Sequence, residues 1–260
     1  MNELWTLVVV LFVLGFIGSL LSGMLGIGGA IIKFPLLLYI PPLFGLVAFS
    51  AHQVSGIIAV EVFFSSFIGL WAYRKDCYFN KELILYMGGA VLVGSFLGSY
   101  GSSFLNEPSI NTVYGILALL ATILMFIPKK ENELTLAERT FPRVLGSVLA
   151  FIVGIGSGIV GAGGGFLLVP IMLTILKIPT RVTIVSSLAI TFISSIGGSV
   201  GKIITGQIEY GPVLVLILAS IFAVPLGAKL GKAMPTKALR VLLALLIAAT
   251  AIKIWIDLLF

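Results

Sequence analysis

Residues 22–38 read Ser22-Gly-Met-Leu-Gly-Ile-Gly-Gly-Ala-Ile-Ile-Lys-Phe-Pro-Leu-Leu-Leu38, and residues 157–173 read Ser157-Gly-Ile-Val-Gly-Ala-Gly-Gly-Gly-Phe-Leu-Leu-Val-Pro-Ile-Met-Leu173. Seven of the 17 positions are identical at a constant offset of 135 residues: the serine, four glycines, the proline and one leucine. Most of the other positions exchange one apolar residue for another. The two stretches therefore indicate an internal repeat, each copy of which contains a glycine-rich break followed by an apolar segment.

The composition shows which solvent surrounds this repeat. Of the 260 residues, 59% are hydrophobic and 10% are charged, whereas a soluble domain carries about 25% charged residues. The mean hydropathy is +1.20. The composition excludes a soluble globular protein and predicts that most of the chain lies in lipid.

Uncharged runs predict an all-α polytopic membrane protein, since about 20 apolar residues cross a bilayer as one helix. The runs that begin at Leu4 and Val144 are too long for one crossing, and each contains one of the glycine clusters. We therefore divide each into a long helix, a glycine turn and a short helix. The expected helices lie near residues 4–22, 30–39, 47–73, 82–104, 109–127, 143–157, 166–177, 181–203, 211–232 and 236–258.

The repeat divides the chain into two halves of five helices. Val54-Ser-Gly-Ile-Ile-Ala aligns with Val185-Ser-Ser-Leu-Ala-Ile at an offset of 131 residues, which extends the repeat beyond the glycine turns. The expected organisation is an N-terminal transmembrane repeat (1–128), a polar linker (129–143) and a C-terminal transmembrane repeat (144–260). The linker is the longest polar stretch and contains seven of the 26 charged residues.

An odd number of helices in each repeat predicts that the second copy is inverted in the membrane. If the linker is cytoplasmic, thirteen of the sixteen basic residues fall on the cytoplasmic side, as the positive-inside rule requires. The sequence thus predicts a multi-pass protein of the inner cell membrane, with both termini outside.

The numbers of cysteines and histidines exclude two kinds of site. The single cysteine, Cys77, excludes an internal disulfide, and the single histidine, His52, excludes a histidine-based metal cluster. The basic residues occur singly or in pairs and form no stripe for a phosphate backbone, so a nucleic-acid partner is not expected. We expect no metal, no cofactor and no catalytic residue.

The paired motifs GMLGIGGAIIKFPLLL and GIVGAGGGFLLVPIML resemble the signature of the toluene-sulfonate uptake permease family, also called the sulfite exporter TauE/SafE family. The resemblance covers essentially the whole chain. It implies an integral membrane transporter of sulfur-containing or small organic anions such as sulfite and sulfonates. The first copy departs from the usual pattern at Ala30, where a third glycine is common, and at Lys33, where an apolar residue is usual.

The glycine turns themselves predict an anion site. A helix that begins inside a membrane leaves backbone N–H groups without partners and directs its positive dipole end toward the turn. If the repeats are inverted, the two turns converge near the bilayer midplane. The candidate substrate-binding glycines are Gly26, Gly28, Gly29, Gly161, Gly163, Gly164 and Gly165. The alternative is that they only allow close helix packing.

Lys33 lies inside the predicted short helix of the first half, and Glu61 is the only acidic residue well inside a predicted span. Lys33 is a candidate to neutralise an anionic substrate, with an ion pair to Glu61 or an extended conformation that reaches the interface as alternatives. Glu61 is a candidate proton carrier or a structural partner of Lys33 or His52. His52 is a second candidate for proton coupling, against a structural hydrogen-bonding role.

Polar residues near the turns complete the predicted site. Gln53 and Ser55 lie at the start of the third helix, and Ser186 and Ser187 lie at the matching place in the eighth. Residues 187, 191, 194 and 195 form one polar helix face. Hydroxyls can donate hydrogen bonds to an oxyanion without a fixed charge. Hydrogen bonding between helices explains them equally well.

We therefore expect a secondary transporter of small anions that lies in the lipid bilayer and works by alternating access. Coupling of transport to protons is one option, and a homo-oligomer is compatible with the sequence. An anion channel lined by the same helix ends is an alternative. An intramembrane enzyme is disfavoured: Ile155 occupies the glycine position of a serine-protease motif around Ser157, and a metalloprotease needs two histidines.

Overall fold

The computed structural model describes residues 2–74, 79–127 and 142–259. These residues form ten α-helices and one 3-10 helix, with no strand among them, which confirms the all-helical prediction. The elements are α1 (Asn2–Leu25), α2 (Ala30–Leu43), α3 (Ala51–Tyr73), α4 (Lys81–Gly101), η1 (Ser102–Phe104), α5 (Glu107–Phe126), α6 (Arg143–Val160), α7 (Gly165–Thr174), α8 (Thr180–Ile204), α9 (Tyr210–Ala233) and α10 (Thr236–Leu259).

Eight of these helices are long and apolar enough to cross a membrane, and α2 and α7 are the shorter ones. Helix ends differ from the predictions by a few residues. α3, for example, begins at Ala51 because Ser50 and Gln53 form a reciprocal capping box there. The predicted linker at 129–143 lies almost entirely outside the described residues, and its last residue, Arg143, begins α6.

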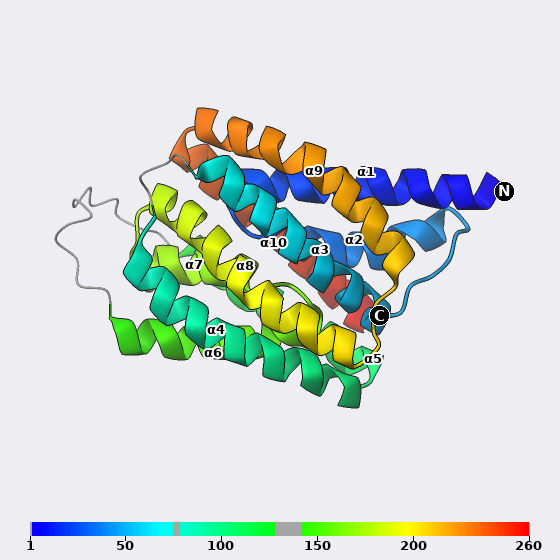
Figure 1. The fold of residues 1–260 in the computed structure, drawn as a ribbon, viewed down its shortest axis with the longest axis horizontal. Helices are drawn as coiled ribbons and strands as arrows, with labels where there is room; N and C mark the ends of the chain where they lie inside the picture. The colour runs from blue at the N-terminus through cyan, green and yellow to red at the C-terminus, as the bar shows by residue number, and fades with distance from the viewer. Residues whose placement is uncertain (1, 75–78, 128–141, 260) are drawn as a thin grey trace.

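The first helix of each half packs most extensively on the fourth helix of the other half: α1 on α9, and α6 on α4 (Figure 1). Glycines allow these backbones to approach closely. A side chain at Gly227 of α9 would overlap the carbonyl oxygen of Leu20, and one at Gly98 of α4 would overlap that of Ile155. In Figure 1, α1 and α6 run in opposite directions along the long axis of the molecule.

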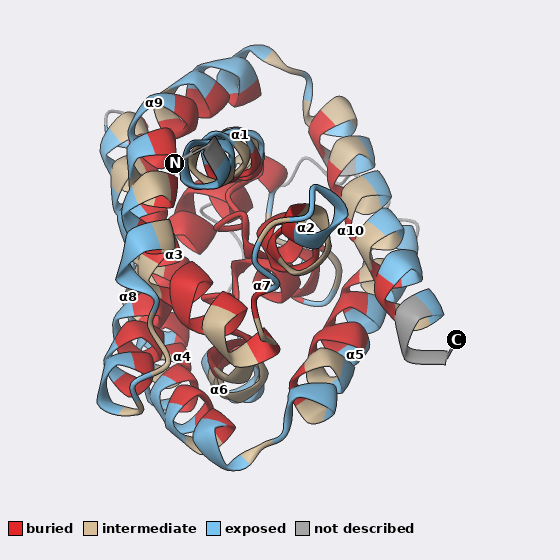
Figure 2. Ribbon diagram, turned by 90° about the vertical axis from the view of Figure 1, so that its right-hand side faces the viewer, coloured by how far each residue is buried: buried red, intermediate tan, exposed pale blue. Residues whose placement is uncertain are grey.

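The short helices lie in the interior. Figure 2 shows α2 and α7 between the side formed by α3, α8 and α9 and the side formed by α5 and α10. The middle of α7 is completely buried. The outer faces of the long helices expose large apolar side chains such as Leu97, Leu214 and Phe222, as expected for contact with lipid. This arrangement places both glycine turns inside the protein.

Candidate functional site

Both glycine turns have the same backbone conformation. The φ angles of three glycines in the first turn are 71°, 72° and 70°, and those of the matching three in the second turn are 77°, 63° and 75°. This left-handed region is open to glycine and costly for other residues. The residues are Gly26, Gly28 and Gly29, and Gly161, Gly163 and Gly164. The offset of 135 residues seen in the sequence therefore relates two turns of the same shape.

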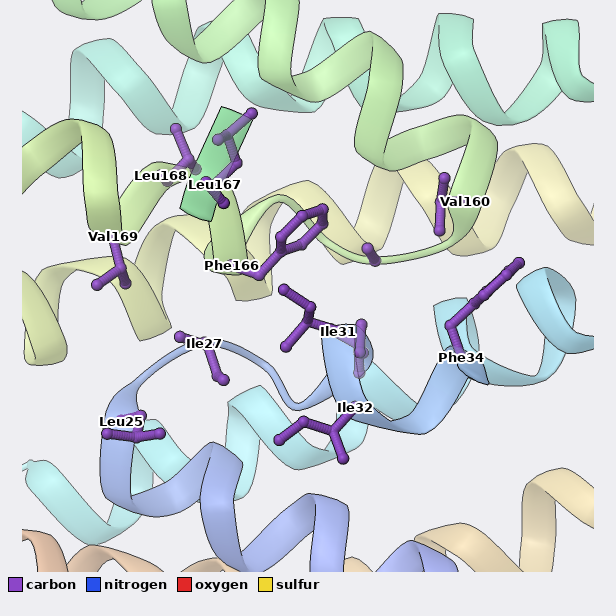
Figure 3. Close-up of a cluster of buried hydrophobic side chains, with 14 of the residues drawn as sticks. Leu25, Ile27, Ile31, Ile32, Phe34, Val160, Phe166, Leu167, Leu168 and Val169 are labelled. Carbon is purple, nitrogen blue, oxygen red and sulfur yellow. The ribbon is translucent and has the colours of Figure 1, made fainter. Parts of the chain in front are cut away.

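The two turns meet at one place. A methyl group at Gly28 would lie 2.9 Å from Thr191 Cγ2 and 3.2 Å from Val62 Cγ1. One at Gly163 would lie 2.7 Å from Val62 Cγ1 and 3.0 Å from Thr191 Cγ2. The turns thus approach the same two side chains from α3 and α8. Figure 3 shows Ile27, Ile31 and Phe166 in the region where the turns approach one another.

Two helix N-termini begin at these turns. The first α-helical hydrogen bond of α2 runs from the Lys33 N–H to the Gly29 carbonyl (3.1 Å), and that of α7 from the Leu168 N–H to the Gly164 carbonyl (2.9 Å). The N–H groups of Ile32 and Leu167 also reach these two carbonyls, at 3.3 and 3.2 Å. The first two N–H groups of each helix, at residues 30 and 31 and at residues 165 and 166, have no described backbone acceptor, and the glycine caps supply no side-chain acceptor. Each turn therefore offers free donors and a positive dipole end to an anion.

Thr191 adds a hydroxyl to this place. The residue is completely buried, and its Oγ1 has no hydrogen-bond partner among the described residues. A side chain at Gly165 would overlap this oxygen, so the hydroxyl lies against the start of α7. We call the set of Gly28, Gly29, Gly163, Gly164, Gly165 and Thr191 the glycine cradle. Its chemistry suits a small anion with several hydrogen-bond acceptors.

Lys33 lies beside the first turn but is not free. Its Nζ is 2.6 Å from Glu61 Oε1, and neither side chain is exposed. The hydroxyls of Ser19 and Ser220 lie 3.2 and 2.5 Å from the same oxygen. The aliphatic stem of Lys33 runs against Gly18 and Gly29. The ion-pair alternative is therefore the one that the structure contains, and Lys33 does not reach the surface.

Two of the four predicted hydroxyl and amide residues contact the turns. Ser187 Oγ donates a hydrogen bond to the Gly26 carbonyl, at 2.8 Å. The Ser55 carbonyl lies directly against Gly161. Ser186 instead accepts a hydrogen bond from the Asn80 N–H, at 3.4 Å. The serines thus join α3 and α8 to the turns and to neighbouring segments.

The described side-chain contacts of Gln53 and His52 are with residues outside the glycine cradle. Besides capping α3, Gln53 donates a hydrogen bond to Glu209 Oε1, at 2.9 Å. The His52 ring lies 3.3 Å from Gln207 Oε1 and 3.0 Å from the Leu105 carbonyl. Neither side chain is fully buried. The described contacts of both residues hold the start of α3 to neighbouring connections.

Two residues of interest were not among the predicted site residues. Thr191 belongs to the polar face expected on the eighth helix, but nothing in the sequence distinguishes it from its serine neighbours. Lys202 is completely buried near the end of α8. The signal that could have identified it is a lysine at the end of a long serine-rich span. In the part of the chain that the structure describes, no group of three or more His, Cys, Asp or Glu residues could hold a metal.

The chain is similar to known proteins over most of its length. The model of the family described as sulfite exporter TauE/SafE matches residues 11–254. The probable membrane transporter protein YunE of Bacillus subtilis is 29% identical over 248 residues, which cover 88% of this chain and 90% of that protein. The probable membrane transporter protein MJ0441 of Methanocaldococcus jannaschii is 26% identical over 93% of both chains. A probable membrane transporter protein of Xylella fastidiosa (strain Temecula1) is 30% identical over 67% of this chain and 65% of its own. No solved structure matches.

Proposed function

The chain belongs to the sulfite exporter TauE/SafE family, and we propose that it is a secondary transporter of small sulfur-containing or organic anions such as sulfite and sulfonates. Family membership and the names of the relatives support a membrane transporter. The physics of the glycine cradle supports a small anion as the substrate. Only the family membership supports a sulfur atom in that anion.

The observation that carries this proposal is the unpartnered hydroxyl of Thr191 between two helix N-termini. A buried hydroxyl without a hydrogen bond is unfavourable, as are the free N–H groups beside it. A bound oxyanion would accept hydrogen bonds from all of these donors at once. The cradle lies beside the middle of α3 and α8, where transporters of this general design place their substrates.

The repeat supports a proposal of alternating access. The two turns share one shape, and the α1–α9 and α6–α4 packings are equivalent under the repeat. We propose that the halves are inverted copies that expose the glycine cradle to each side in turn. The cytoplasmic linker and the outside termini are part of this proposal.

Proton coupling would use Glu61 or His52. Glu61 Oε2 is buried without a hydrogen-bond partner among the described residues, and the other carboxylate oxygen is paired with Lys33 beside the first turn. The described contacts of His52 are with Gln207 and Leu105, which do not belong to the glycine cradle. We therefore propose Glu61 as the proton carrier.

The test is uptake into proteoliposomes of labelled sulfite, ethanesulfonate, sulfate and acetate, with and without an imposed pH gradient. Saturable uptake of sulfite or ethanesulfonate that accelerates with the gradient is the expected result. Equal, non-saturating flux of all four anions would indicate a channel. No flux of any of them by folded protein would overturn the proposed substrate class.

A further inference from the structure

A second buried lysine lies near the other turn. Lys202, in the last turn of α8, is completely buried, and its Nζ lies within hydrogen-bond distance of four acceptors. These are Ser55 Oγ and Ser102 Oγ, both at 2.7 Å, Gln207 Oε1 at 2.8 Å and the Ile159 carbonyl at 3.1 Å. All four are neutral. In Figure 1 the end of α8, in yellow, lies beside the end of α4, where η1 begins with Ser102.

The described acceptors of Lys202 are all neutral, whereas the other buried lysine, Lys33, is paired with a carboxylate. Among the side chains whose burial the structure describes, the buried charged ones are Lys33, Glu61 and Lys202. Lys33 and Glu61 neutralise one another at 2.6 Å. No ion pair within 4 Å involves Lys202 in the described part of the chain. An ammonium at Lys202 is therefore a buried positive charge without a carboxylate partner among the described side chains, which is costly in a medium of low dielectric constant.

A bound anion would compensate this charge, and the neutral partners would allow it to do so. A carboxylate bound to the ammonium would compete with an incoming anion by charge, as Glu61 does at Lys33. Hydroxyl and amide oxygens hold the ammonium by hydrogen bonds alone. Hydrogen bonds from an ammonium to a negatively charged acceptor are stronger than those to a neutral acceptor. An anion that replaces Ser102 or Gln207 at Nζ therefore gains Coulomb attraction that those groups lack.

The acceptors of Lys202 come from two regions, the second glycine turn and the connections that follow α4 and α8. Ser55 and Ile159 lie beside the second glycine turn, since the Ser55 carbonyl abuts Gly161 and Ile159 precedes that turn by two residues. Ser102 and Gln207 lie in the short connections that follow α4 and α8. Gln207 also contacts His52, which is partly exposed. The ammonium is thus between the partly exposed end of the helices and the glycine cradle.

We propose that Lys202 binds the transported anion directly, at a second subsite, and that its single charge selects monovalent anions such as alkyl sulfonates and hydrogen sulfite. The inference rests on the proposed function and deepens it. Ser102 and Gln207 hold the ammonium in the empty state and give way when the anion arrives. A monoanion at this subsite leaves the buried interior neutral, whereas a dianion leaves it with a negative charge.

The test compares wild-type protein with Lys202→Met, Ser102→Ala and Lys81→Met in proteoliposomes, using labelled ethanesulfonate. Lys202→Met should raise KM at least about tenfold because the charge is lost. Ser102→Ala should lower KM by roughly threefold because one neutral competitor is gone. Lys81 is exposed at the start of α4, so Lys81→Met should leave KM unchanged and controls for net charge.

A structural role for Lys202 gives a different pattern. In that case Lys202→Met and Ser102→Ala both lower the melting temperature and Vmax, and KM stays the same, which would overturn the proposal. If Lys202→Met does not fold, Ser102→Ala decides: a lower KM supports the subsite, and an equal or higher KM overturns it. Sulfate competing with ethanesulfonate as strongly as unlabelled ethanesulfonate does would overturn the selection by charge.

The two proposals fail in different ways. If folded wild-type protein takes up none of the anions, the proposed function itself fails. If wild-type uptake is saturable and Lys202→Met has the wild-type KM, transport stands and only the subsite is lost.

Discussion

The Lys33 ammonium and the Glu61 carboxylate form an ion pair at 2.6 Å in which both side chains are completely buried. The pair joins α2, which begins at the first glycine turn, to α3, and the hydroxyls of Ser19 and Ser220 extend it to α1 and α9. Because each charge neutralises the other inside the protein, we expect the two residues to act as a unit.

The first prediction concerns the stability of this unit. Lys33→Met leaves the Glu61 charge buried and unpaired, so it should lower the free energy of unfolding by about 3–5 kcal/mol. Lys33→Met with Glu61→Gln removes both charges and should recover most of that loss. Chemical unfolding in detergent, read by tryptophan fluorescence, measures both. Losses that simply add in the double variant would show that the pair is not coupled.

The second prediction concerns Thr191. Thr191→Val replaces the hydroxyl with a methyl group of similar size, and the hydroxyl has no hydrogen-bond partner in the described structure. Removing it should therefore leave the melting temperature unchanged or higher. If the hydroxyl binds the anion, KM for sulfite should rise about tenfold, which corresponds to the loss of one good hydrogen bond.

The control for this variant is Thr122→Val. Thr122 Oγ1 bonds to the Ala118 carbonyl within α5, so its removal tests the loss of a helix-bound hydroxyl outside the glycine cradle. It should not change KM. A Thr191→Val protein with the wild-type KM would remove Thr191 from the cradle.

The third prediction concerns the cradle glycines. Gly28→Ala and Gly163→Ala each force alanine into a left-handed conformation and place a methyl group 3.0 Å or less from Thr191 Cγ2. Both should reduce sulfite uptake by at least about tenfold. Gly45 has a similar φ of 68° but no atom within 4 Å of the added methyl group. Gly45→Ala therefore reproduces the backbone strain, roughly 1–2 kcal/mol, without filling the cradle, and should transport normally.

Gly45→Ala with the same transport defect as Gly28→Ala would mean that strain, and not the space in the cradle, limits uptake. Melting temperatures of all three variants separate this outcome from a failure to fold.

The helices and the shape of the turns could be predicted because they depend on local sequence. The apolar runs give the helices, and the spacing of Gly26, Gly28 and Gly29 recurs at Gly161, Gly163 and Gly164 with the same sign of φ at each position. A left-handed φ is a property of single residues, so a repeated glycine pattern predicts it directly. The predicted turns are present where the sequence places them.

The polar partners could not be predicted, because they depend on how distant helices cross. The sequence left Lys33 open between substrate, Glu61 and the interface. Only the packing of α2 against α3 brings the two charges to 2.6 Å. Likewise, the acceptors of Lys202 come from segments between 5 and 147 residues away along the chain. A single sequence contains no signal for such distances.

The last prediction separates the two candidates for proton coupling. The Lys33→Met/Glu61→Gln protein keeps a neutral interior at this pair and lacks the carboxylate, so it should bind and exchange sulfite between the two sides of the vesicle. Its net uptake should no longer accelerate with an imposed pH gradient, because no group takes the proton across. His52→Gln should keep that acceleration, since the described contacts of His52 anchor a helix start. Counterflow and gradient-driven uptake, measured on the same vesicles, check both statements. If His52→Gln loses the acceleration and the double variant keeps it, the proton passes through His52 and the buried pair is structural.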